Sequence, residues 1–126
     1  MALNYELLWK VLAGEPSLKA VEQRLVKLSD QELKGAAAAF VDARTELVDA
    51  LTQQGADASE DILDDIAGFL IREGRHPYEQ YLAGSRSLPP SETWGDLEEA
   101  SVAGPFIRVV RARLRTSIFD LWESEA

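Results

Sequence analysis

Apolar residues recur at three- and four-residue intervals along nearly the whole of this 126-residue chain. That interval is the repeat of an α-helix with one buried face, whereas a half-buried strand would alternate at every second residue. No stretch shows the alternating pattern, and neither an internal repeat nor a linker-like composition interrupts the chain. The sequence therefore predicts an all-α fold: a compact bundle of five to seven helices in one domain over residues 1–126.

Glycine and proline mark where the expected helices end. Gly14 with Pro16, and then Gly55, Gly74 and Gly84, each follow a helical stretch, as expected of residues that end a helix. The connections are short, which favours antiparallel neighbours, and residues 84–96 form the main loop. We expect helices at about 3–13, 18–28, 30–54, 60–73 and 77–83, and one last helix from about 104 to 122.

Capping residues mark where the expected helices begin. Ser17 suits an N-cap, and Ser29 with Glu32 forms a capping box. The fourth helix begins at either a second capping box, residues 57–60, or Ser59, and Pro77 suits the first position of the fifth. The fourth helix is expected to bury one stripe of apolar residues: Ile62, Leu63, Ile66, Phe69 and Leu70.

Charge and composition exclude several classes of function. Thirteen basic against 22 acidic residues give a net charge of −9, which argues against binding to nucleic acid phosphates. The chain has no cysteine, so disulfides, a thiol nucleophile and thiolate metal sites are excluded, and no metal or cofactor is expected. The apolar start of the chain is interrupted by Glu6 and is interpreted as a helix rather than a secretion signal. No apolar run is long enough to cross a bilayer, so a cytoplasmic location is expected.

The densest charge cluster lies at the start of the fourth helix. Its members are Asp57, Glu60, Asp61, Asp64 and Asp65. Acids in a first helical turn complement the helix dipole, which explains some of them without a function. Residues 30–65 hold ten acids and two bases, however, and such a stripe suits a partner with a basic surface. Trp94, in the Pro- and Ser-rich loop, is a candidate anchor for that interface.

Two other sets of residues suggest weaker alternatives. Arg108, Arg111 and Arg115 are spaced to share one helix face, which would either pair with neighbouring acids or bind an anion. His76, the only histidine, is the natural candidate for a general base, and Arg75, Tyr78 and Tyr81 would line a pocket with it. No Ser-His-acid or HExxH arrangement accompanies it, so an enzyme is the less favoured interpretation.

Three segments resemble the bacterial domain of unknown function numbered 4240. They are LLWKVL, LSDQEL and SEDILDDIAGFLIREGRHPYEQYLAGSRSL, and the resemblance is most specific over residues 59–82. Glu98-Glu99 leading to VAGPF matches less closely, and Leu47-Val48 stands where the family tends to carry Leu-Trp. The resemblance implies an all-α fold and a bacterial source. The family has no assigned activity, so no catalytic residue is carried over.

These observations favour an acidic protein-binding domain. Its most specific form is an immunity-type protein that neutralises a toxin with a basic active site. The first alternative is a small-ligand or anion-binding protein or an enzyme, using His76 and the arginine face. The second is a structural or regulatory interaction module.

Overall fold

The computed structural model describes residues 3–97 and 100–125, and it confirms the all-α prediction. Seven helices have at least seven residues, one helix and a 3-10 segment are a single turn each, and the described residues contain no strand. The elements are α1 (Tyr5–Val11), α2 (Leu18–Val26), α3 (Asp30–Gln53), α4 (Glu60–Arg72), α5 (Arg75–Leu82), η1 (Ser91–Thr93), α6 (Trp94–Leu97), α7 (Ala103–Leu114) and α8 (Ile118–Glu125).

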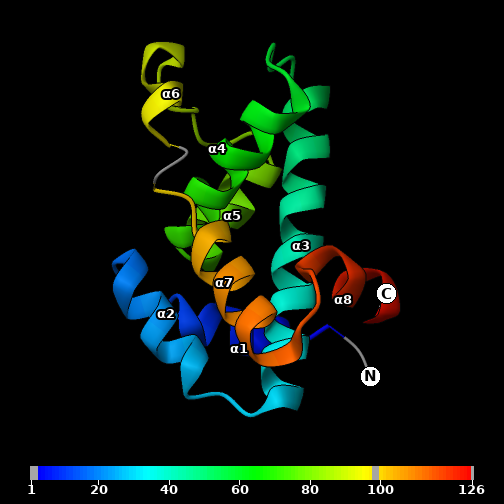
Figure 1. The fold of residues 1–126 in the computed structure, drawn as a ribbon. Coiled ribbons are helices and arrows are strands. Elements are labelled where there is room, and N and C mark those ends of the chain that lie inside the picture. The colour runs from blue at the N-terminus through cyan, green and yellow to red at the C-terminus, as the bar shows by residue number, and fades with distance from the viewer. Residues whose placement is uncertain (1–2, 98–99, 126) are drawn as a thin grey trace.

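Helix α3 is the axis of the bundle, and α1, α4, α5, α7 and α8 all pack against it (Figure 1). Its 24 residues are buried on more than one face, because the Ala36–Ala39 run adds little bulk and neighbouring helices can approach closely. Phe40, the next residue, stacks on Phe106 of α7, with ring centroids 4.8 Å apart and planes 4° from parallel. This stacked pair joins α3 to α7 at the centre of the core.

The predicted serine caps are confirmed. The hydroxyl of Ser17 accepts a hydrogen bond from Ala20 N at 3.1 Å. Ser29 and Glu32 form the full capping box, with Glu32 N donating to Ser29 Oγ and Ser29 N donating to Glu32 Oε1. Helix α4 begins after Ser59, so the alternative capping box at residues 57–60 does not form.

The predicted single last helix is wrong, because the chain breaks between α7 and α8. Arg115 adopts a left-handed conformation (φ 55°, ψ 39°) and its backbone N–H still bonds to Arg111 O. Ser117 then begins α8, with its hydroxyl accepting from Asp120 N at 3.1 Å. Neither glycine nor proline marks the break, so the usual stop signals gave no warning of it.

Two smaller boundaries also differ from the prediction. Helix α5 begins at Arg75 rather than Pro77, because Gly74 acts as its N-cap with φ 112°, a conformation that L-residues rarely adopt. Pro77 therefore lies third in the helix, still within the first turn, where a missing N–H costs nothing. The expected loop over residues 84–96 contains η1 and the start of α6.

The capping box predicts a specific change in acid sensitivity. The pKa of Glu32 lies below its ordinary value of 4.5, because its carboxylate accepts the Ser29 backbone N–H and bonds with the Ser29 side chain. A lowered folded-state pKa stabilises the fold above pH 4.5, and this contribution is lost as the pH falls through the lowered pKa. Glu32→Gln should therefore lose less stability than the wild type on acidification from about pH 5 to pH 3. Urea unfolding across that range measures it, with Glu92→Gln on η1 as a charge-matched control, and parallel curves for all three proteins would contradict it.

Candidate functional site

The acidic cluster at the start of α4 divides into an outer and an inner part. Asp57, Glu60 and Asp61 are exposed, whereas Asp64 and Asp65 are half-buried. Ile62 lies beside the outer acids with 43% of its surface exposed, so its predicted place in the core is wrong. Within the described residues, no ion pair involves Asp57, Glu60 or Asp61. We name Asp57, Glu60, Asp61 and Ile62 the outer acidic surface.

The inner acids face an arginine that the sequence analysis missed. Arg44 of α3 is only 6% exposed, and its Nε lies 4.0 Å from Asp64 Oδ1. Its guanidinium also lies 5.4 Å from the Phe40 ring centroid and 5.0 Å from that of Phe119. The signal was available in the sequence, because Arg44 lies four residues after Phe40 and three before Leu47, on the same face of the helix as these two apolar residues.

Burial shifts the pKa values of the two members of this pair in opposite directions. Burial lowers the pKa of Arg44, while the charges of Asp64 and Asp65 raise it. Burial raises the pKa of Asp64, and the nearby Arg44 opposes that rise. Asp64 and Asp65 therefore compensate an internal cation, which makes them poor candidates for contact charges.

Trp94 lies at the start of α6, which packs against α4 (Figure 1). Its indole is half-buried, and Nε1 donates to Pro89 O at 2.9 Å. The tryptophan thus holds its own loop together, and its polar atom is already used within the chain. This position gives little support to its predicted role as an interface anchor.

The predicted arginine face does not form as a set of three. Arg108 and Arg111 are exposed on α7, and Arg108 Nε pairs with Glu22 Oε1 of α2 at 2.9 Å. Arg115 follows the helix in the left-handed conformation, so it does not continue the face. Among the described residues no ion pair involves Arg111, and one exposed arginine on this face of α7 is too little for an anion site.

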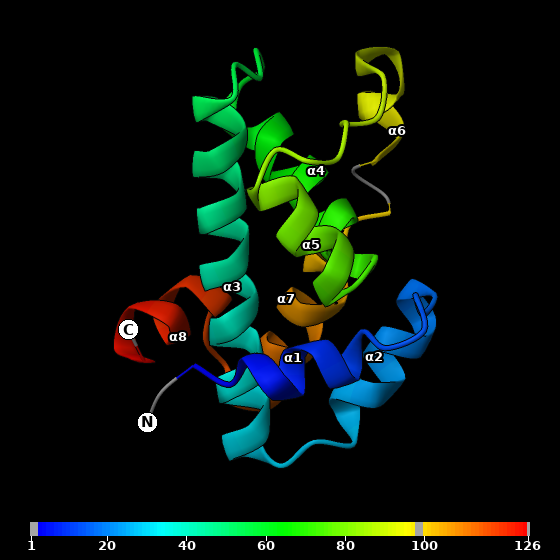
Figure 2. The same ribbon diagram turned by 180° about the vertical axis from the view of Figure 1, so that it is seen from behind.

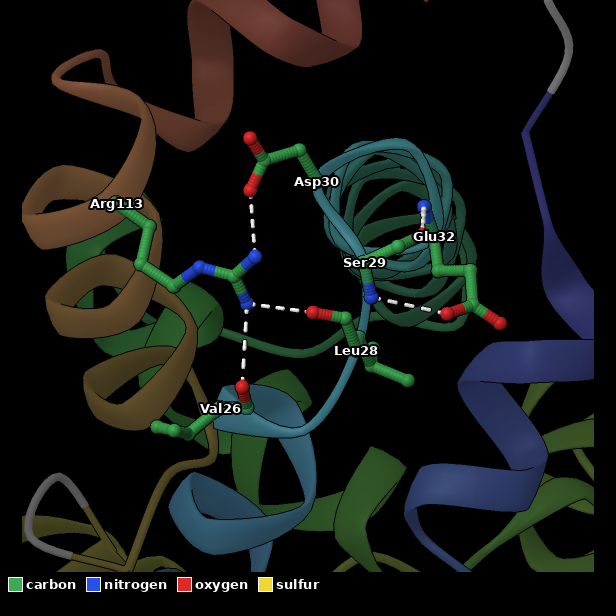
Figure 3. A network of polar contacts seen from close by, with 6 residues as sticks. All are labelled: Val26, Leu28, Ser29, Asp30, Glu32 and Arg113. Atoms are coloured by element: carbon green, nitrogen blue, oxygen red, sulfur yellow. Dashed lines mark hydrogen bonds and ion pairs between the residues drawn. The ribbon is translucent and has the colours of Figure 1, made fainter.

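Arg113, which the face prediction left out, has the clearest structural role among the arginines of α7. Its Nη1 donates to Leu28 O at 2.6 Å and to Val26 O at 3.3 Å, while Nη2 pairs with Asp30 at 2.5 Å (Figure 3). One guanidinium thereby satisfies carbonyls at the end of α2 and a carboxylate at the start of α3. It fixes the α2–α3 turn against α7.

A cavity of about 650 Å³ lies between α1 and α5, which share one side of the molecule (Figure 2). Of the predicted pocket residues, it brings together only Arg75 and Tyr78. His76 is exposed and is not among the lining residues, and Tyr81 bonds instead to Glu73 at 3.2 Å. The full lining is Tyr5, Glu6, Trp9, Arg75, Tyr78 and Glu79.

The α1 side of this cavity was missed, although Tyr5 and Trp9 are four residues apart on one helix face. The Tyr5 hydroxyl donates to Asp42 of α3, which also accepts from Trp122 Nε1 at 3.1 Å. The Tyr78 hydroxyl donates to Glu46 Oε2 at 3.3 Å.

The two phenols that reach the cavity stay protonated. Burial, followed by its hydrogen bond to Asp42, raises the pKa of Tyr5. Burial also raises the pKa of Tyr78, with the Glu46 charge as the next cause. Both hydroxyls therefore act as hydrogen-bond donors near neutral pH rather than as bases or nucleophiles.

No group of three or more metal-ligating side chains occurs among the described residues. The helices described here include none that is both long and apolar enough to span a membrane. Comparison of the chain with protein families, with curated proteins and with solved structures finds no match. The resemblance to domain 4240 therefore stays a prediction, and the function is argued from the surfaces and the cavity alone.

Proposed function

We propose that this chain is a protein-binding domain whose outer acidic surface docks on a partner with a basic surface. The observation that carries the proposal is the exposed Ile62 beside Glu60 and Asp61 in the first turn of α4. Interfaces concentrate their binding energy in a few apolar anchors, which a polar rim shields from water. Ile62 with its neighbouring carboxylates has the same make-up as such an interface, one apolar side chain with charged groups beside it.

The charges of the outer acidic surface support a basic partner specifically. Asp57, Glu60 and Asp61 project into solvent, while the inner acids are occupied by Arg44. The chain as a whole carries a net charge of −9. A cationic partner would be attracted over a distance of about one Debye length, roughly 8–10 Å at physiological salt, and would associate faster for it.

The finer proposal is an immunity-type protein of the cytoplasm that neutralises a toxin. A toxin that acts on nucleic acid needs a basic active site to hold phosphates, and an acidic, single-domain protein can occupy such a site. The small size of the chain and its concentrated acids support this version. Inhibition of the partner's activity distinguishes it from a regulatory module that binds without inhibiting.

Charge reversal tests the proposal. The double variant Glu60→Lys/Asp61→Lys should lower the association rate constant at least about tenfold, because it replaces attraction with repulsion. Ile62→Ser should instead raise the dissociation rate, at a cost of about 1–2 kcal/mol, because it removes the apolar anchor. The partner is first captured from the native host and identified, and both rates are then measured with the purified pair at several salt concentrations.

A charge-matched control separates local contact from net charge. Glu15→Lys/Glu123→Lys makes the same change in net charge at exposed positions outside the first turn of α4. This control should keep most of the association rate, and circular dichroism should show that every variant is folded. Equal loss in the control and the α4 variant, or no loss in either, would overturn the proposal.

A further inference from the structure

We propose that the cavity between α1 and α5 binds an organic cation, an alkylammonium or guanidinium group. We name it the aromatic cavity, with the six lining residues given above. The proposal is independent of the outer acidic surface. The first turn of α4 lies near the upper end of the molecule in Figure 1, whereas α1 lies near the lower end.

Three aromatic side chains form one wall of the aromatic cavity. The Trp9 ring centroid lies 6.4 Å from that of Tyr5 and 5.1 Å from that of Tyr78. The ring planes are tilted by 39° and 45°, so the three rings form a curved wall rather than a flat stack. A cation within about 6 Å of such ring centroids is attracted by the negative faces of the rings, most strongly by tryptophan.

The charges around the wall have the sign that a cation requires. Glu6 and Glu79 line the cavity, and Asp42 and Glu46 lie behind it as acceptors of the two phenol protons. A phenol that donates to a carboxylate gains electron density, which strengthens its attraction for a cation. Arg75 is the one basic residue in the lining and pairs with Glu79 at 2.7 Å, so the charge that the lining keeps for a cation is that of Glu6.

The size of the aromatic cavity fits a small organic ligand. A volume of about 650 Å³ lies within the usual range of ligand pockets, roughly 300–1,000 Å³. A hydrated metal ion would gain nothing from the rings, whereas a trimethylammonium or guanidinium group is weakly hydrated and fits against them. The same cation can come from a free amine or from a basic side chain of a polypeptide, and the experiment separates these sources.

The test follows the three tryptophan indole signals by ¹H–¹⁵N NMR, assigned with Trp94→Phe and Trp9→Leu. Choline and agmatine are the free cations, and 3,3-dimethylbutan-1-ol is the neutral analogue of choline. We expect the cations to shift the Trp9 signal saturably with a Kd of about 1 mM, and the neutral analogue to bind at least about tenfold more weakly. The second arm of the experiment uses an arginine-containing tetrapeptide with blocked ends. If the peptide binds more tightly than agmatine, the natural cation is a polypeptide side chain. If it binds more weakly, the natural cation is a free amine.

Two variants make the proposal falsifiable. Trp9→Leu, followed by the backbone amide signals of α1 and α5 because its indole signal is lost, should weaken choline binding about tenfold or more. Glu6→Gln, a change at an exposed position, should weaken it about two- to fivefold and reduce its salt dependence. Glu92→Gln removes the same charge from η1 and should leave binding unchanged. The proposal is overturned if choline gives no saturable shift, if the neutral analogue binds equally well, or if Glu6→Gln and Glu92→Gln behave alike. None of these outcomes depends on whether the outer acidic surface binds a partner.

Discussion

Phe40→Ala should lower the free energy of unfolding by about 3–5 kcal/mol, the range for emptying a buried phenylalanine site. Phe40 is fully buried and stacks on Phe106, so its removal opens a hole between α3 and α7. It also takes away the ring beneath the Arg44 guanidinium. A loss of this size is a large share of the stability of a domain with about 5–15 kcal/mol in total.

Urea unfolding followed by circular dichroism measures this loss. Val26→Ala is the control, since Val26 is 57% exposed and its truncation should change stability by less than about 0.5 kcal/mol. A Phe40→Ala protein that loses less than about 1 kcal/mol would show that the core collapses around the missing ring. In that case the stacked pair would not be the joint between α3 and α7.

Arg44→Met should be the second most damaging change, at about 2 kcal/mol near neutral pH. Methionine preserves most of the packing against Phe40 and Phe119 but leaves Asp64 and Asp65 without their opposing charge. Loss of one partner of a fully buried pair costs about 3–5 kcal/mol, and the smaller figure reflects the one-third exposure of the Asp64 side chain.

The deficit of Arg44→Met should grow as the pH rises. Burial already raises the pKa of Asp64 above its ordinary value of 3.8, and Arg44 holds that rise in check. Without Arg44 the folded state binds the Asp64 proton more tightly than the unfolded state does, so deprotonation destabilises the fold. The variant should thus approach wild-type stability below the ordinary pKa of 3.8, and its deficit should grow as the pH rises through the raised folded-state pKa of Asp64. Arg111→Met, an exposed control on α7, should show no such trend, and a deficit independent of pH would contradict this account.

The sequence predicted those parts of the fold that depend on neighbouring residues. Ser29 and Glu32 form their capping box within one turn, so a local pattern contains all the information needed. Arg115 ends α7 in a left-handed conformation without a glycine, and α8 beyond it packs on α3, a contact between segments far apart in the sequence. Ile62 and Leu63 both looked apolar enough for the core, and only the placement of neighbouring helices decides which of them is covered.

The candidate sites were predictable to a smaller extent. The acidic start of α4 can be recognised in the sequence. Its division into outer acids and acids that face Arg44 cannot, because it depends on α3 lying beside α4. The aromatic cavity combines Tyr5 and Trp9 of α1 with Tyr78 of α5, far along the sequence. No local pattern contains that pairing, which arises because α1 and α5 pack against the same central helix.

The arrangement around α3 has a consequence for the order in which the chain can fold during synthesis. The Asp42 carboxylate accepts a hydrogen bond from the indole N–H of Trp122, eighty positions later, and the Phe119 ring lies over the Arg44 guanidinium. This side of α3 therefore stays in contact with water, or with whatever binds nascent chains, until α8 has left the ribosome. Substitutions that weaken the packing of α8 should therefore reduce the yield of soluble protein in cells more than their effect on equilibrium stability would suggest.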